Sequence, residues 1–249
     1  DLYVIFMLEH KYNSWLEELF KVGEQPYRQN QEALEYLKNL QGWYNKVIVA
    51  GGGWLCVGAA INPPIGLAGG IVTLTINELG IRVDRLVATI EELLKIEGIT
   101  VTPSVKTDRG TIDLLVQTPD RRCFAFALKS KKDSRVKWRE DRQDFFATSP
   151  GKGKMPVVKK WSDLTKTAQD LNTRTLALKK EKSYLLRGGK NIITKAILLT
   201  SKTTVDPNND SSLFVDFGQI KALRVHVGSY IYMIERAEIL KFIAPVEKS

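Results

Sequence analysis

Apolar residues recur at helical spacing in the first 45 positions, between 82 and 98, and again over 161–182. The first region predicts two short amphipathic helices, separated by Gly23 and Pro26. The second, "RVDRLVATIEELLKIEG", places six apolar residues on one stripe, and Gly98 is a suitable residue at which that helix ends. These patterns predict helices on both sides of the strand-like central part of the chain.

Strand-like runs fill most of the second half of the chain. Continuous or alternating apolar residues predict strands near 99–106, 111–118 and 122–130. The run "NIITKAILLTS" predicts an interior strand. More strands are expected near the C-terminal end, over 213–217, 222–234 and 238–244. The basic stretch up to about residue 159 is expected to be rich in turns.

The order of these elements predicts a fold class. A helix, three strands, a helix and a further strand indicate an α/β domain with a mixed sheet over 82–249, flanked by helices. The residues before it are expected to form two separate regions. Residues 1–45 are the amphipathic helices, and 46–81 are an apolar, glycine-rich region.

The apolar region "VIVAGGGWLCVGAAINPPIGLAGGIVTLTI" carries no charged residue from 47 to 76. Pro63 and Pro64 divide it into two arms, each shorter than the ~20 residues that span a bilayer as one straight helix. Basic residues flank it on both sides, which favours a helical hairpin whose two ends face the cytoplasm. We therefore expect a membrane anchor that contacts lipid through Trp54, Pro63 and Pro64. A buried hairpin of a soluble core remains the alternative.

The net charge of +9 changes the picture of possible partners. The excess is local, because 129–195 holds 19 Lys and Arg against 7 Asp and Glu. A basic surface of this kind favours a polyanion, either nucleic acid, DNA more than RNA, or an anionic membrane leaflet. An ordinary solvated surface would have the same composition. The expected nucleic-acid contacts are Lys131, Lys132, Arg135, Lys137, Lys152, Lys154, Lys159 and Lys160.

Other chemistries find little support in the sequence. The two cysteines and two histidines lack the close spacing of a zinc site or a disulfide framework. The glycines of the apolar region precede no Gly-Lys-Ser/Thr, so a phosphate-binding loop of that type is not expected.

The stretch "GTIDLLVQTPDRRCFAFALKSK", residues 110–131, carries the candidate chemistry. It reads as two strands around a turn, and side chains alternate between the faces of a strand. This alternation predicts Asp113, Ala127 and Lys129 on one face of the sheet. Phosphodiester hydrolysis uses carboxylates to hold Mg²⁺ and a lysine to stabilise developing charge.

Residues 82–200 resemble the PD-(D/E)XK nuclease-like superfamily, which includes restriction endonucleases. "GTIDLLV" is similar to the second strand of that fold and "CFAFALKSK" to the third. The resemblance implies a restriction-endonuclease-like core, with Asp113 as the first metal ligand and Lys129 as the catalytic lysine. It also implies Mg²⁺ as cofactor and an acid from the first helix, for which Glu91 is a candidate. Ala127 occupies the place of the family's second acid, and a methyl group does not ligate a metal.

These observations lead to one expected function and two alternatives. The expectation is a membrane-associated, nuclease-like domain, on the cytoplasmic side, that binds nucleic acid and is catalytically impaired at Ala127. An active Mg²⁺-dependent endonuclease with a relocated carboxylate is the first alternative. A non-enzymatic subunit of a membrane protein assembly, with protein partners in the membrane, is the second. An ordinary hairpin with a surface Asp and Lys also remains open.

Overall fold

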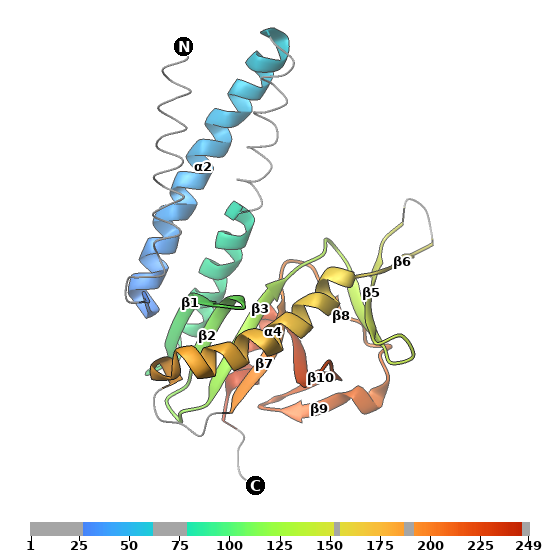
Figure 1. Ribbon diagram of the computed structural model, residues 1–249. Coiled ribbons are helices and arrows are strands. Elements are labelled where there is room, and N and C mark those ends of the chain that lie inside the picture. The colour runs from blue at the N-terminus through green and yellow to red at the C-terminus, as the bar shows by residue number, and fades with distance from the viewer. Residues whose placement is uncertain (1–26, 62–78, 152–154, 187–191, 246–249) are drawn as a thin grey trace.

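A seven-stranded mixed sheet forms the centre of the fold (Figure 1). The computed structural model describes residues 27–61, 79–151, 155–186 and 192–245, and for 47–61 it describes the backbone alone. The strands occur in the order β1 (Thr100–Thr107), β2 (Gly110–Gln117), β3 (Cys123–Lys129), β7 (Ile193–Leu199), β11 (Tyr230–Glu235), β10 (Ile220–His226) and β9 (Phe214–Phe217). β7 runs parallel to both of its neighbours, and the other pairs are antiparallel. The predicted α/β class with a mixed sheet is confirmed.

Helices cover both faces of this sheet. α4 (Ser162–Glu181) crosses one face and contacts β1, β2, β3 and β7 (Figure 1). The opposite face carries a helix over 79–93 and the short α5 (Ile239–Ile243). Short 3-10 turns follow α4 at Ser183–Leu186, precede β9 at Ser211–Leu213 and follow β11 at Arg236–Glu238.

Strand alternation explains the two core layers. Leu114, Phe124 and Phe126 pack with the apolar stripe of the helix over 79–93. Leu115 and Ala125 pack on the other side with residues of α4. Fully burying a large apolar side chain contributes about 1.5–3 kcal/mol, so these two layers hold the helices on the sheet. The helix over 79–93 ends before the predicted residue 98, and Gly98 then adopts φ of 73°.

The N-terminal region differs from the predicted division at residue 45. α2 (Asn30–Ile61) continues without a break through the first apolar arm. Asn30 attaches it to the start of β1, because its side chain donates to the carbonyl of Ile99 and accepts the N–H of Val101 at 2.7 Å. The helix predicted before Gly23 and the second apolar arm lie outside the described residues.

The basic stretch predicted to be rich in turns is instead a second sheet. Its strands are ordered β6 (Val157–Lys160), β5 (Asp144–Ser149), β4 (Arg135–Arg139) and β8 (Thr204–Val205). Every second residue of β4 and β5 faces the core, where Trp138 packs on Phe145 with ring centroids 4.7 Å apart. The prediction of turns was wrong because each strand is short, and in β4 the apolar residues alternate with charged ones. The strand predicted over 238–244 was also wrong, since α5 occupies that range.

Glu235 joins the two sheets. It ends β11, and its Oε1 accepts the N–H of Val205 on β8 at 3.1 Å. Burial raises the pKa of the Glu235 carboxyl, and the nearby Glu238 raises it further. The hydrogen bond from Val205 opposes this rise in part, and the net effect is that the Glu235 carboxyl binds a proton more readily in the folded than in the unfolded chain.

The raised pKa of Glu235 should be visible in how the stability of the variant Glu235→Gln depends on pH. A carboxyl whose pKa is raised on folding destabilises the native state as pH rises through that pKa, and has no such effect below its unfolded pKa. Glu235→Gln is therefore expected to increase the free energy of unfolding at pH 7 relative to the wild type, with the gain disappearing near pH 4. Urea unfolding at both pH values measures the difference. The exposed Glu140→Gln serves as control, and an equal gain in both variants would contradict the assignment.

Candidate functional site

Asp113 lies in β2 where the ladder to β3 ends. The last backbone pair of the β2–β3 ladder is Leu114 with Phe126. Beyond it, the side chain of Asp113 accepts a hydrogen bond from the backbone of β3 in place of a main-chain carbonyl. Its Oδ2 accepts the N–H of Leu128 at 2.8 Å, and its Oδ1 forms an ion pair with the guanidinium of Arg82. The Asp113 side chain is only 12% exposed, whereas that of Arg82 is 49% exposed. Both carboxylate oxygens are thus engaged by donors of the protein.

A local distortion of the sheet explains why the Asp113 side chain faces the helix over 79–93. Ser104 of β1 stands opposite Asp113 and has φ of 53°, in the left-handed region. Ile112 packs with Leu115, while Leu114 between them packs on the opposite face. A regular strand would place Ile112 and Leu114 on the same face, so the alternation breaks at Asp113. The Asp113 carboxylate reaches Arg82, which belongs to the helix over 79–93.

Lys129 ends β3 and points toward α4. Its Nζ lies 2.7 Å from Oδ2 of Asp163, in the first turn of that helix. An acidic residue near a helix N-terminus is favoured by the helix dipole, which also explains why a carboxylate stands there. Sequence reasoning missed Asp163 because its role depends on how α4 packs on the sheet. The two predicted catalytic residues therefore bind partners on different helices, Asp113 on one face and Lys129 on the other.

Ala127 is 2% exposed and packs among apolar side chains. Its neighbours in that cluster include Ala125, Leu171 and Ile193. As the alternation predicted, it shares its face with Leu115 and Ala125. The place expected for a second acid is thus part of the hydrophobic core between β3 and α4.

Glu91 belongs to the contact between two helices. Its Oε1 lies 2.7 Å from Nζ of Lys38 on α2, and Gln41 of α2 donates similarly to Asp84 at 2.8 Å. The structure thus pairs Glu91 with Lys38 of α2, whereas Asp113 pairs with Arg82. Among the described residues, no group of three or more His, Cys, Asp or Glu is arranged to hold a metal ion.

The surroundings of Cys123 disfavour a role as a nucleophile. Burial raises the pKa of its thiol to about 12, against a smaller opposing effect of the Lys179 charge. The thiol therefore stays protonated near neutral pH, and only the thiolate reacts readily.

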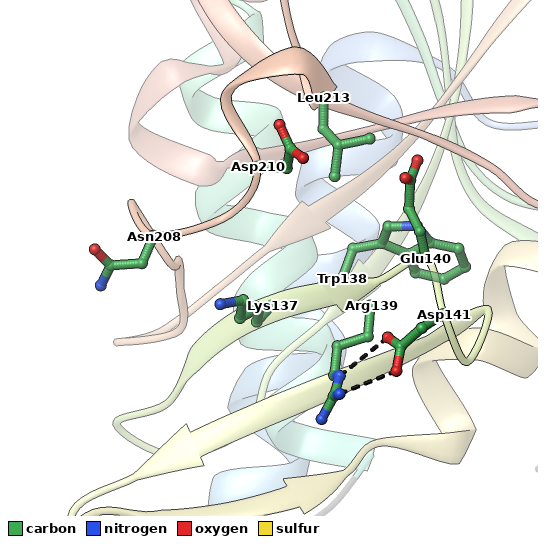
Figure 2. Close-up of a pocket in the computed structure, with 8 residues that line it drawn as sticks. All are labelled: Lys137, Trp138, Arg139, Glu140, Asp141, Asn208, Asp210 and Leu213. Atoms are coloured by element: carbon green, nitrogen blue, oxygen red, sulfur yellow. Dashed lines mark hydrogen bonds and ion pairs between the residues drawn. The ribbon is translucent and has the colours of Figure 1, made fainter.

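An open depression of about 390 Å³ lies beside the end of β4 (Figure 2). Charged residues of the β4–β5 turn line one side and the loop after β8 lines the other. Asp141 accepts two hydrogen bonds from the Arg139 guanidinium, at 3.0 and 3.2 Å. Asp210 accepts from the backbone and hydroxyl of Ser212, which lower the pKa of its carboxyl. These carboxylates are already paired within the protein. Among the predicted site residues whose side chains the structure describes, Lys137 is the one that lines the depression.

The predicted basic residues divide among three places. Arg135 and Lys137 lie on β4, and Lys159 and Lys160 on β6. Lys131 and Lys132 follow β3, where Nζ of Lys131 lies 5.3 Å from the ring centroid of Trp161. Lys152 and Lys154 lie outside the described residues. Four of the eight thus belong to the second sheet, which sequence reasoning did not predict.

The predicted membrane contacts cannot be placed in the same way. Trp54 belongs to α2, whose backbone alone is described there, and Pro63 and Pro64 lie outside the described residues. Within the described part of the chain, none of the helices combines the length and apolarity needed to cross a bilayer.

Comparisons with protein-family models, with curated proteins and with solved structures find no match to this chain.

Proposed function

We propose that this chain is a nuclease-like domain that binds nucleic acid without efficient cleavage. The observation that carries the proposal is the state of Asp113. Arg82 and the N–H of Leu128 occupy its two carboxylate oxygens, and Ala127 stands where the resemblance requires a second acid. A divalent cation needs several free oxygen ligands, and the guanidinium of Arg82 supplies the positive charge that a metal would otherwise bring.

The arrangement of the elements supports the resemblance to the PD-(D/E)XK superfamily. The helix over 79–93 is followed by the antiparallel strands β1, β2 and β3, and α4 is followed by β7, which is parallel to β3. Between β3 and α4 the chain also forms β4, β5 and β6 of the second sheet, as an insertion into this order. Without the insertion, this is the order that the resemblance implies for a restriction-endonuclease-like core. The basic excess over 129–195 supports nucleic acid as the ligand, with DNA preferred to RNA.

Binding and cleavage assays on the full chain test this proposal. We expect DNA binding that weakens steeply between 50 and 200 mM salt, because phosphate contacts release counterions. We expect no cleavage of plasmid or short duplexes in Mg²⁺ or Mn²⁺. Absence of DNA and RNA binding at low salt would refute the binding role. Cleavage that disappears in Asp113→Asn would refute the loss of catalysis.

We also propose that residues 47–76 attach the protein to a membrane, with the basic domain on its cytoplasmic side. The absence of charge over 30 residues and the basic residues at both ends support this proposal. Membrane fractionation of the full chain and of a variant without 46–81 tests it. A full-length chain that stays in the soluble fraction, like the deletion variant, would contradict the attachment.

A further inference from the structure

The outer face of the four-stranded sheet gathers basic side chains around one aromatic ring. The inner face is apolar, so period-two alternation turns the remaining residues of β4, β5 and β6 outward. We call this surface the basic sheet face. Its members are Arg135, Lys137, Arg139, Arg142, Phe146 and Lys160.

The register of the strands sets the spacing of these charges. Lys137 and Lys160 both pair with Phe146, from opposite sides, so the three residues form a row across three strands. Neighbouring strands lie about 4.8 Å apart, which puts the two lysine backbones roughly 10 Å from each other. Along β4, alternate residues carry Arg135, Lys137 and Arg139 at intervals of about 6.8 Å. This spacing suits successive phosphates of an extended strand.

Flat guanidinium groups cover the aromatic ring at the centre of the face. Arg139 and Arg142 lie 5.5 and 5.8 Å from the Phe146 ring centroid, and Phe146 is buried. Arg139 is held further by its two hydrogen bonds to Asp141 (Figure 2). Guanidinium planes stack on nucleobases, so this arrangement offers stacking surfaces beside the charges.

Acidic residues neutralise only part of the face. Asp141 pairs with both Arg139 and Arg142, and Asp144 lies 2.5 Å from Nζ of Lys160. Within the described part of the chain, Arg135 and Lys137 form no ion pair with a carboxylate. Their charges remain available to an anionic ligand.

We propose that the basic sheet face holds the sugar-phosphate backbone of a single nucleic-acid strand. The inference rests on the proposed nucleic-acid binding and adds the surface and the strandedness of the ligand. A single strand fits better than a duplex because the guanidinium groups of the face can stack on unpaired bases, whereas the bases of a duplex are already paired and stacked on each other. Arg135 and Lys137 contact phosphates.

The test compares two double variants of the full chain in detergent. Arg135→Gln with Lys137→Gln removes two charges from the face. Lys221→Gln with Lys241→Gln removes two exposed charges from β10 and α5, outside the four-stranded sheet, and is the matched control. Fluorescence anisotropy follows binding of a labelled oligothymidylate of about 16 nucleotides, within single-domain site sizes, over a range of salt concentrations. Circular dichroism and thermal unfolding confirm that both variants fold.

The loss of two phosphate contacts should change the salt dependence of binding by a predictable amount. For single strands each contact contributes about 0.7 to the slope of log K against log salt, so the slope should become shallower by about 1.4 in the face variant. If the two phosphate contacts contribute nothing to affinity near 1 M salt, the face variant should bind about 25-fold more weakly than the wild type at 0.1 M salt. The control should retain its slope, and Arg135→Lys with Lys137→Arg should retain most of the affinity because the charges remain.

Each contrary result has its own meaning. If the wild type binds the oligonucleotide but the face variant has the same affinity and salt slope as the control variant, the assignment of binding to the basic sheet face is wrong, while the proposed function stands. If a duplex of equal length binds more tightly than the single strand, the ligand class is wrong. If the face variant loses binding to phosphatidylserine vesicles but keeps the oligonucleotide, the face belongs to a membrane. If the wild type binds no nucleic acid at low salt, the proposed function fails as well.

Discussion

Replacement of Asp113 by alanine is expected to lower the free energy of unfolding by about 2–4 kcal/mol. The change removes two charge-assisted hydrogen bonds, each contributing about 1.5–3 kcal/mol, although Arg82 is half exposed and regains water. It also leaves the buried N–H of Leu128 without an acceptor, where the ladder from β2 to β3 has already ended. Urea unfolding of the full chain measures the loss.

A double-mutant cycle with Arg82 tests whether the two residues act as a pair. Arg82→Ala leaves a mostly buried carboxylate without its counter-charge, and we expect a loss of about 1–3 kcal/mol. The double variant should lose less than the sum of the two single changes. Asp113→Asn keeps an acceptor for Leu128 while removing the charge, and should fall between the wild type and Asp113→Ala. Additive losses would show that Arg82 does not hold the carboxylate.

Magnesium provides an independent readout of the same pair. A ligand that binds only the folded state raises its stability in proportion to the logarithm of its concentration. Because Arg82 occupies the Asp113 carboxylate, Mg²⁺ should stabilise the wild type no more than it stabilises Asp113→Asn. Stabilisation of the wild type alone would identify a functional metal site and would favour the active endonuclease.

The elements that sequence patterns predicted well have either a mostly apolar sequence, as β2 and β3 do, or a regular apolar period, as α4 does. β1, β2, β3 and α4 begin and end within two residues of the predicted ranges, because most of their residues pack against neighbours on at least one face. The strands of the second sheet are only two to six residues long, and β4 buries alternate residues with charged side chains between them. β6 buries none of its residues, so the apolar pattern of this sheet is weak in the sequence. The range 238–244 is a short apolar run, and such runs do not distinguish a strand from a helix by periodicity.

The candidate site was predictable only as far as regular alternation holds. Alternation correctly places Leu115, Ala125 and Ala127 on the α4 side of the sheet. It fails at Asp113, because Ser104 opposite it adopts a left-handed conformation and the pairing with β3 has stopped. Neither event has a signal in the sequence, since serine rarely marks such a backbone conformation. The partners of these charged groups, Arg82 and Asp163, follow from helix packing and not from strand spacing.

Ala127→Asp is expected to destabilise the protein by about 3 kcal/mol or more without restoring cleavage. The new carboxylate would enter an apolar cluster between β3 and α4, and a buried charge without a partner is costly or becomes protonated. It would also find no second ligand, because the Asp113 carboxylate is paired with Arg82 on the side of the helix over 79–93.

Ala127→Asn is the matched control, since asparagine has nearly the same shape without the charge. The difference in the free energy of unfolding between the two variants isolates the cost of the carboxylate. That difference should shrink from pH 7 to pH 4, because burial raises the pKa of the new carboxyl and the folded state binds its proton. Plasmid cleavage in Mg²⁺ and Mn²⁺ is measured on the same samples. A stable Ala127→Asp variant that cleaves DNA would show that β2 and β3 of the wild type form a metal site that lacks one ligand. It would also show that a metal ion can displace the guanidinium of Arg82 from the Asp113 carboxylate.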